Sequence, residues 1–448
     1  MAKQDGLEWV AGTFGLEPCW TAEPDIAKIE LLVRKHFKLE QNACCQVNLY
    51  AQGAFNKLYK IETDTRSSLM RVTLPVDPSN KTNSEVATII FIHQNTDIPV
   101  PQIFGFDDSS ENELDFEWIL MEMLPGETLR TRWRKLSKDA KRDLVKQVAK
   151  YQAQLFRYQF SAIGNIFVDS GAQLTSKESS QSTIAADTTE AQETSQQLLP
   201  SPGQLVSIVF FWGDHITQDV PRGPFTSSEY WVRARLALVL ADQERIIKTS
   251  DDEDDIEEAE DAEEIAKRLL KLLPSIFSSN TDTLELSVLF HDDLSMQNIL
   301  VDSDGRITGL IDWECVSALP LWRACELPSF LKGRDRNEEP KRDQYAADNS
   351  EEDTVELTNE VLDNEGVNSL YWEHLLEYEL TMLRDLFLKE MGNIAPGWIQ
   401  ELEKGADKAD FEVAVQNCDN SWRTKQVKSW LDALEMGKVW NLRRSFLE

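Results

Sequence analysis

The sequence predicts an α+β protein of two lobes, in which a small antiparallel β-sheet is followed by a larger, mainly helical part. Short strand-like pieces crowd residues 46–124, and one helical pattern, SEVATIIFIHQN, interrupts them. Beyond residue 125, apolar residues recur at helical spacing in several long segments. With 448 residues, 41% of them hydrophobic, the chain can bury a sizeable core in two lobes.

The order of the elements follows from local patterns. Residues 1–45 are interpreted as an N-terminal helical extension, because WTAEPDIAKIELLVRKHF combines a Thr/Pro start with apolar residues at near-helical spacing. In the first lobe, residues 46–124, we expect the strands CCQVNLYAQ, KLYKIET, SLMRVTLP, QIFGFD and EWILMEML. In the second lobe, residues 125–448, we expect the helices SKDAKRDLVKQVAKYQAQLFRY, SEYWVRARLALVLADQERIIKT, EEIAKRLLKLLPSIF and YWEHLLEYELTMLRDLFLKEM.

One disordered insertion and two acidic loops are predicted in the second lobe, and of these Ser170–Leu199 and Asp251–Glu258 are expected to be mobile and to contribute neither to the fold nor to the chemistry. Residues 170–203 are rich in Ser, Thr and Gln and nearly free of large apolar side chains, so they predict a disordered insertion. Residues 250–264 and 343–366 carry runs of acidic residues, which are typical of solvated loops or helix faces, and we interpret both as acidic loops.

Composition limits the partners that we expect. The formal net charge is −32, from 46 Lys+Arg and 78 Asp+Glu, which disfavours nucleic acid. No run of about 18 apolar residues is present, so no membrane partner is expected. The six cysteines lack CxxC spacing and predict reduced thiols rather than a metal site. We expect a cytoplasmic protein, although a mitochondrial location stays open, and nothing indicates the oligomeric state.

The stretch VLFHDDLSMQNILVDSDGRITGLIDWE, Val288–Glu314, reads as strand, loop, strand, Asp-Gly turn and strand. This hairpin would bring Asn298 and Asp312 together, with Asp293 facing both. One carboxylate that orients a hydroxyl, with an amide and a second carboxylate that hold magnesium, suits phosphoryl transfer. The alternative is a surface hairpin with ordinary turn residues, and spacing alone favours neither interpretation.

A family resemblance rests on these residues. The pattern H-x-D-x-x-x-x-N, given by His291, Asp293 and Asn298, is followed by IDWE at Ile311–Glu314, and together they resemble the aminoglycoside phosphotransferase/choline kinase-like family. The stretches FFWGDHITQDVPRGPF and LWRACELPSFL resemble the fungal phosphotransferase-enzyme branch of that family. The resemblance runs in order from about residue 47 to 330. It implies a protein-kinase-like fold and an enzyme, a small-molecule kinase that moves the γ-phosphate of ATP to an alcohol group.

The resemblance also implies roles for single residues. Asp293 is similar to the catalytic base of the family, and Asn298 and Asp312 are similar to its Mg²⁺ ligands. Gly53, in YAQGAFNKLYKIET, corresponds to the phosphate-covering loop, although one glycine alone is equally typical of a plain turn. Arg71 stands where the kinase fold usually has a phosphate-binding lysine, and the alternative is a surface arginine on an edge strand.

Further positions complete the expected nucleotide site, for ATP or GTP. Glu85 would pair with Arg71, although an acidic residue is also common in the first turn of a helix. Glu122 and Met123, in WILMEMLPGETL, would offer backbone groups to the adenine ring, or belong to an ordinary buried strand. His291 would brace the catalytic loop, and Asp292 replaces a glycine common in the family.

The acceptor is expected to be a small-molecule hydroxyl compound, bound near Asp293 and the loop Asp214–Arg222. That loop, in FFWGDHITQDVPRGPF, would line a substrate cleft or else pack helices. A different class of function stays open, a catalytically degenerate kinase-like binding or scaffold protein, which Arg71 and the thin glycine loop favour. A protein kinase is disfavoured, because no activation segment or APE-like signature follows Asp312.

Overall fold

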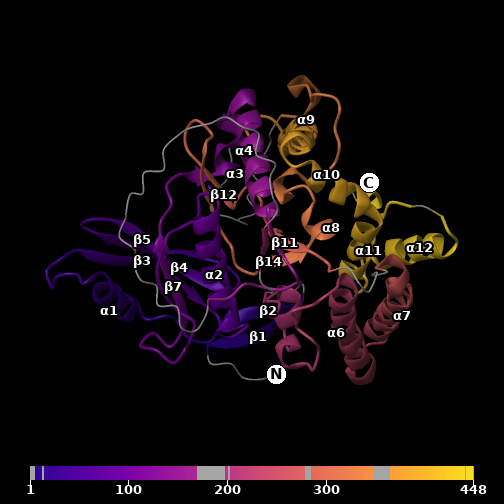
Figure 1. Cartoon of the computed structure of the whole chain (residues 1–448), viewed down its shortest axis with the longest axis horizontal. Coiled ribbons are helices and arrows are strands. Elements are labelled where there is room, and N and C mark those ends of the chain that lie inside the picture. Colours follow the sequence, from indigo (N-terminus) through magenta and orange to yellow (C-terminus); the bar gives the residue numbers. More distant parts are fainter. Residues whose placement is uncertain are drawn as a thin grey trace.

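The computed structural model describes residues 6–12, 15–168, 197–199, 202–277, 284–347, 364–438 and 440–446. It confirms the two-lobed, kinase-like α+β fold, with the sheet lobe drawn in indigo and purple and the helical lobe in magenta to yellow (Figure 1). The first lobe holds a fully antiparallel sheet in the order β3-β4-β5-β7-β6. Its strands are β3 (Cys45–Gln52), β4 (Asn56–Thr63), β5 (Ser67–Thr73), β6 (Ile103–Asp107) and β7 (Glu117–Glu122).

Helices cover both faces of this sheet. Helix α1 (Ile26–Phe37) packs with Met70 and Val72 of β5, whereas α2 (Asn80–Asn95) packs on the opposite face. Because successive side chains of a strand point to opposite faces, Arg71 points towards α2 between two residues that face α1. The alternation of β5 therefore aims a cation at the helix that carries Glu85.

The interpretation of residues 1–45 as a helical extension is wrong in part. A hairpin of β1 (Leu7–Gly12) and β2 (Gly15–Trp20) precedes α1. It lies low in the view, near the N-terminal mark (Figure 1). Buried and exposed side chains do not alternate regularly along β1 and β2. The hairpin is stabilised by distant partners, since Leu7 is buried in a cluster with Phe55 and Phe211.

The second lobe is built around α4 (Lys138–Phe156), whose apolar face is buried in one large core. Two small sheets lie beside it, one of β9 (Tyr158–Phe160), β10 (Gln197–Leu199), β11 (Ser287–Phe290) and β14 (Ser317–Pro320), the other of β8 (Glu127–Thr128), β12 (Ile299–Val301) and β13 (Ile307–Leu310). The remaining helices are α3 (Leu129–Arg132), α5 (Ile208–Phe211), α6 (Ser228–Thr249), α7 (Glu253–Ile276), α8 (Leu321–Ala324), α9 (Ser369–Ile394), α10 (Pro396–Lys404), α11 (Ala406–Gln416), α12 (Thr424–Glu435) and α13 (Leu442–Ser445). Among the residues that the structure describes, no helix is both long and apolar enough to cross a membrane.

The predicted acidic loop at residues 250–264 is instead the first half of α7. Asp252 caps this helix by accepting a hydrogen bond from the N–H of Asp254, and acidic residues fill its first turn, where the helix dipole favours negative charge. Ala259, Ala262 and Ile265 are buried, so the acidic residues form the solvated side of an amphipathic helix. The charge run concealed that apolar stripe.

The predicted insertion and the other predicted acidic loop are described only at their edges. Of residues 170–203, those at 170–196 and 200–201 lie outside the described residues, and residues 197–199 form β10, which pairs in parallel with β9. The prediction of disorder therefore fails at this end of the segment. Of residues 343–366, those at 348–363 lie outside the described residues, and Ala347 forms an isolated bridge with Val367.

Candidate active site

The loop that carries Asp293 lies between β11 and the β12–β13 hairpin, as the strand pattern predicted. Within the hairpin Ile299 faces Leu310, and the N–H of Ile311 donates to the carbonyl of Asn298 over 3.0 Å. This pairing places Asp312 directly beyond the position opposite Asn298. Imidazole Nε2 of His291 lies 3.0 Å from the Ile311 carbonyl, so the histidine joins the loop to the end of the hairpin.

Asp293 is held within this loop and its carboxylate faces outward. The Asn298 amide Nδ2 donates to the Asp293 carbonyl over 2.9 Å and to its Oδ2 over 3.0 Å. Partial burial raises the pKa of Asp293, the nearby charge of His291 opposes that rise, and the charges of Asp312 and Asp292 add to it. The site therefore contains a carboxylate with increased basicity and a fixed orientation.

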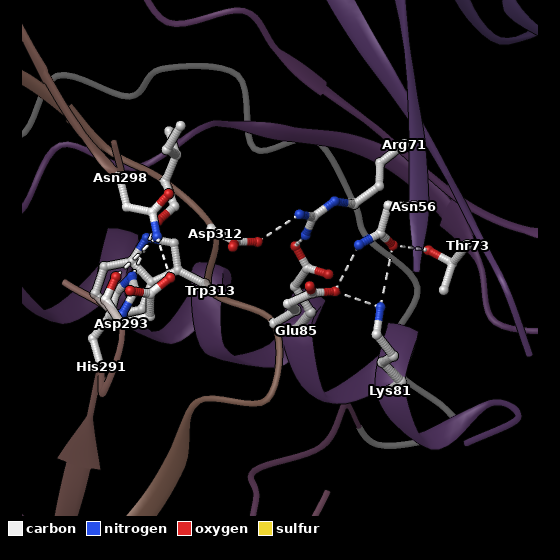
Figure 2. Close-up of polar contacts among 12 residues, drawn as sticks. Asn56, Arg71, Thr73, Lys81, Glu85, His291, Asp293, Asn298, Asp312 and Trp313 are labelled. Carbon is white, nitrogen blue, oxygen red and sulfur yellow. Dashed lines mark hydrogen bonds and ion pairs between the residues drawn. The ribbon is translucent and has the colours of Figure 1, made fainter. Parts of the chain in front are cut away.

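Arg71 connects the two lobes at the predicted nucleotide site. Its Nη1 pairs with Glu85 of α2, and its Nη2 lies 2.6 Å from Oδ1 of Asp312. Figure 2 shows Asp312 between the guanidinium of Arg71 and the cluster of His291, Asp293 and Asn298. The ion pair expected between Arg71 and Glu85 is present, and the contact with Asp312 was not foreseen. Backbone φ of Asp312 is 65°, a region that Asp and Asn enter more readily than most residues.

A second polar group beside Arg71 was not predicted from the sequence. Lys81, in the first turn of α2, places Nζ 2.5 Å from Oε2 of Glu314 and 3.1 Å from Oδ1 of Asn56. The Asn56 amide donates to the same Glu314 oxygen over 2.7 Å and accepts from the Thr73 hydroxyl over 3.0 Å. Burial alone would raise the pKa of Glu314, but Lys81 and Arg71 outweigh it and lower the value to about 2. Nothing in the sequence marks Lys81, because its importance arises from burial alone.

The expected nucleotide-binding backbone groups lie where the strand pattern places them. Gly53 opens the turn between β3 and β4, and its N–H donates to the Asn56 carbonyl over 2.9 Å. A Cβ at Gly53 would meet no atom closer than 4.0 Å, so the turn itself does not require glycine, and the space above it is open. The Glu122 N–H already donates to the Gln102 carbonyl, which leaves Met123 as the expected backbone donor to an adenine ring.

A cavity of about 430 Å³ opens beside Asp293. Its lining includes the carboxylates Asp292, Asp293, Asp312 and Glu314, and also Arg235 and Arg323 close to Glu412. Both Nη1 contacts of Arg235 with the Glu412 carboxylate are short, at 2.6 and 2.8 Å. The cavity thus combines several carboxylates with two arginines that are already paired.

The loop Asp214–Arg222 does not line this cavity, contrary to expectation. The wall is formed instead by residues just before it, Leu205 and Ser207 to Val209. Trp212 packs on Trp9 of the N-terminal hairpin, with ring centroids 5.0 Å apart, and His215 is bound to Asp242 of α6. The loop therefore packs on neighbouring elements and does not contribute to the cavity lining.

The predicted metal ligands are suitable for Mg²⁺ by the chemistry of their donor atoms. Asp312 offers carboxylate oxygens, and Asn298 offers an amide oxygen because its amide nitrogen is engaged by Asp293. Hard oxygen donors of this kind suit Mg²⁺. Among the described residues, the one group of three His, Cys, Asp or Glu ligands close enough to hold a metal is Asp214, His215 and Asp242, and there Arg245 already pairs with both carboxylates.

A small antiparallel sheet lobe, a helical lobe, and an Asp–Asn–Asp set at their junction are the features of a kinase-like phosphotransferase fold. The chain belongs to the phosphotransferase enzyme family, whose model matches residues 46–354, more than half of the chain. The resemblance predicted from the HxDxxxxN and IDWE motifs is therefore confirmed.

Curated relatives match parts of the chain. A subtelomeric hrmA-associated cluster protein of Aspergillus fumigatus is 33% identical over 132 residues, which are 29% of this chain and 26% of that protein. The Kluyveromyces lactis protein named "altered inheritance of mitochondria protein 9, mitochondrial" is 24% identical over 297 residues, 60% of this chain and 47% of that protein. The chain thus spans less than half the length of either relative.

Solved structures with a similar arrangement include aminoglycoside phosphotransferase APH(4)-Ia, which is 12% identical with a TM-score of 0.42 and covers 91% of this chain and 99% of that one. A putative fructosamine-3-kinase from Haemophilus somnus is 10% identical with a TM-score of 0.42, covering 90% and 95% of the two chains.

Proposed function

We propose that this protein is an ATP-dependent phosphotransferase, with GTP as the alternative donor, that phosphorylates a hydroxyl group of a small molecule. The observation that carries the proposal is that Asp293 and Asp312 line one cavity of about 430 Å³. A cavity of this size is typical of sites for small ligands. The shared cavity allows an acceptor hydroxyl at Asp293 to lie close to phosphates held near Asp312.

The proposed step is an in-line displacement. The acceptor oxygen forms a bond to the γ-phosphorus while the bond from that phosphorus to the bridging oxygen breaks, which leaves the nucleoside diphosphate. The hydroxyl proton passes to the carboxylate of Asp293, whose raised pKa favours that transfer. Asn298 keeps this carboxylate oriented through its amide hydrogen bonds.

The nucleotide side depends on Arg71 and the metal ligands. Arg71, held by Glu85, would place a permanent positive charge against the phosphates. Asn298 and Asp312 would hold Mg²⁺, which when bound neutralises charge on the phosphate oxygens. Gly53 would allow its turn to lie close over the phosphates, and Met123 would donate its N–H to the base.

A catalytically degenerate binding or scaffold protein remains the second candidate, favoured by arginine at position 71. Thermal unfolding with ATP, in the presence and absence of magnesium, separates the two. The enzyme predicts a stabilisation that requires magnesium, and the scaffold predicts none.

The acceptor is best found by a direct search. Purified protein with radiolabelled ATP is incubated with a library of hydroxyl-bearing metabolites, and Asp293→Asn protein is the matched control. The proposal expects label on at least one metabolite with the natural protein and none with the variant. Equal labelling by both proteins would contradict the assigned role of Asp293.

A further inference from the structure

A buried ion pair that the proposed chemistry does not use joins the two lobes. Lys81 of α2 is 1% exposed and lies 2.5 Å from Glu314, whose side chain is 18% exposed. Glu314 belongs to the helical lobe and follows Asp312 by two residues. A buried charge without a partner is costly, so each of these side chains requires the other.

Asn56 is held by both members of this pair. Its amide nitrogen donates to Glu314 over 2.7 Å, and its amide oxygen accepts from Lys81 over 3.1 Å. Figure 2 shows Lys81 and Asn56 pointing towards one another on the side of Arg71 away from Asp293. Asn56 is itself buried, so water does not compete readily for these hydrogen bonds.

Asn56 in turn anchors the turn Gly53–Phe55. The Asn56 carbonyl accepts from the N–H of Gly53 over 2.9 Å, and the Phe55 carbonyl accepts from the N–H of Leu74 over 2.8 Å. On its apolar side the turn is held separately, because the Phe55 ring packs 5.5 Å from that of Phe211. Loss of the polar anchor should therefore loosen the turn without unfolding the lobe.

We propose that Lys81 and Glu314 are positioning residues that hold the turn Gly53–Phe55, through Asn56, at a set distance from Asp312. This inference deepens the proposed function. It rests on that function for the identity of the ligand, a nucleotide that binds between the turn and Asp312. Glu314 and Asp312 lie on one short segment, so one contact sets the turn relative to the proposed metal ligand. Such preorganisation lowers the ordering that nucleotide binding would otherwise require.

Two double variants separate the effect of the hydrogen bond from that of the charges, and a third serves as the control. Lys81→Met/Glu314→Leu removes both charges and the acceptor for Asn56, whereas Lys81→Met/Glu314→Gln removes the charges and retains an acceptor. Neither leaves a buried ion unpaired, so both are expected to fold. The matched control is Lys141→Met/Glu379→Leu, because that Lys–Glu pair is similarly buried, at 7% and 13% exposed, and joins α4 to α9 away from the site.

The first measurement needs no ligand. Amide hydrogen exchange of Gly53 reports the opening of the turn, and we expect it to be about tenfold faster in the Leu variant and near that of the natural protein in the Gln variant. The control should leave Gly53 unchanged. The inference would be overturned if Gly53 exchanged at the rate of the natural protein in the Leu variant, or if its exchange were accelerated equally in the control.

The second measurement is calorimetric binding of a non-hydrolysable ATP analogue with magnesium. The Leu variant should bind about tenfold more weakly than the natural protein, with recovery in the Gln variant. Equal affinities of all variants would also overturn the inference. Failure of the natural protein to bind the analogue would instead refute the proposed function, because the exchange experiment tests the anchor independently.

Discussion

Replacement of Arg71 by alanine gives the sharpest test of the interlobe site. The guanidinium is buried and neutralises both Glu85, which is 2% exposed, and Asp312. Burial already raises the pKa of Glu85. The charges of Arg71 and Lys81 oppose this rise, and Arg71 makes the larger contribution. Without Arg71 the pKa of Glu85 should therefore rise further, so that the folded protein takes up a proton.

The size of the effect follows from the cost of that proton. The ordinary pKa of Glu85 is 4.5, and each pH unit above it costs about 1.4 kcal/mol when the folded protein keeps the group protonated. Arg71→Ala should therefore lower the free energy of unfolding by up to about 3 kcal/mol at pH 7 and by less than about 1 kcal/mol at pH 5. The sign is that of a raised folded-state pKa: stability is retained below pH 4.5 and lost as the pH rises.

Urea unfolding at pH 5 and pH 7 measures this difference, and calorimetry on the same protein should show weaker nucleotide binding. The stability of Arg71→Lys is expected to lie between those of the natural protein and Arg71→Ala, because one ammonium group cannot replace both Nη contacts of the guanidinium. The control is Arg384→Ala, which removes a buried arginine that donates to the carbonyls of Leu331 and Arg334, remote from the site. The reasoning would be refuted if Arg71→Ala had the same free energy of unfolding as the natural protein, or if it lost the same amount at both pH values.

Three further predictions concern single carboxylates. Asp293→Asn should retain magnesium-dependent nucleotide binding but lose roughly 10²–10⁴-fold in turnover, because no base takes the hydroxyl proton; unchanged kcat with an identified acceptor would contradict this. Asp312→Asn, which the positive φ tolerates, should weaken nucleotide binding in magnesium much more than in EDTA, and equal losses in both would exclude a metal ligand. Burial raises the pKa of Glu117 to about 7, so this group destabilises the fold as the pH rises from 4.5 to 7; Glu117→Gln should therefore be more stable at pH 8 by up to about 3 kcal/mol in urea unfolding, whereas Glu40→Gln at an exposed position should not.

The strands near the candidate site were predictable because they carry local signals. Alternating apolar residues identify β4 and β5, and the Asp-Gly turn identifies the β12–β13 hairpin. The acidic start of α7 was misassigned, since a charge run outweighed three buried positions spaced along one helix face. The N-terminal hairpin was missed because its stability depends on contacts with Phe55 and Phe211 far along the chain.

The sequence by itself determined the two-lobed α+β class, the succession of strands along the chain in the first lobe, and the motif that contains Asp293, Asn298 and Asp312. Those features depend on neighbours within a few residues, which periodicity and turn chemistry reveal. Tertiary structure alone decided that Arg71 contacts Asp312 and that Lys81 pairs with Glu314, 233 positions further along the chain. The physical reason is that an ordinary lysine becomes a structural ion only when packing removes water from it, and no local pattern records which distant carboxylate will lie beside it.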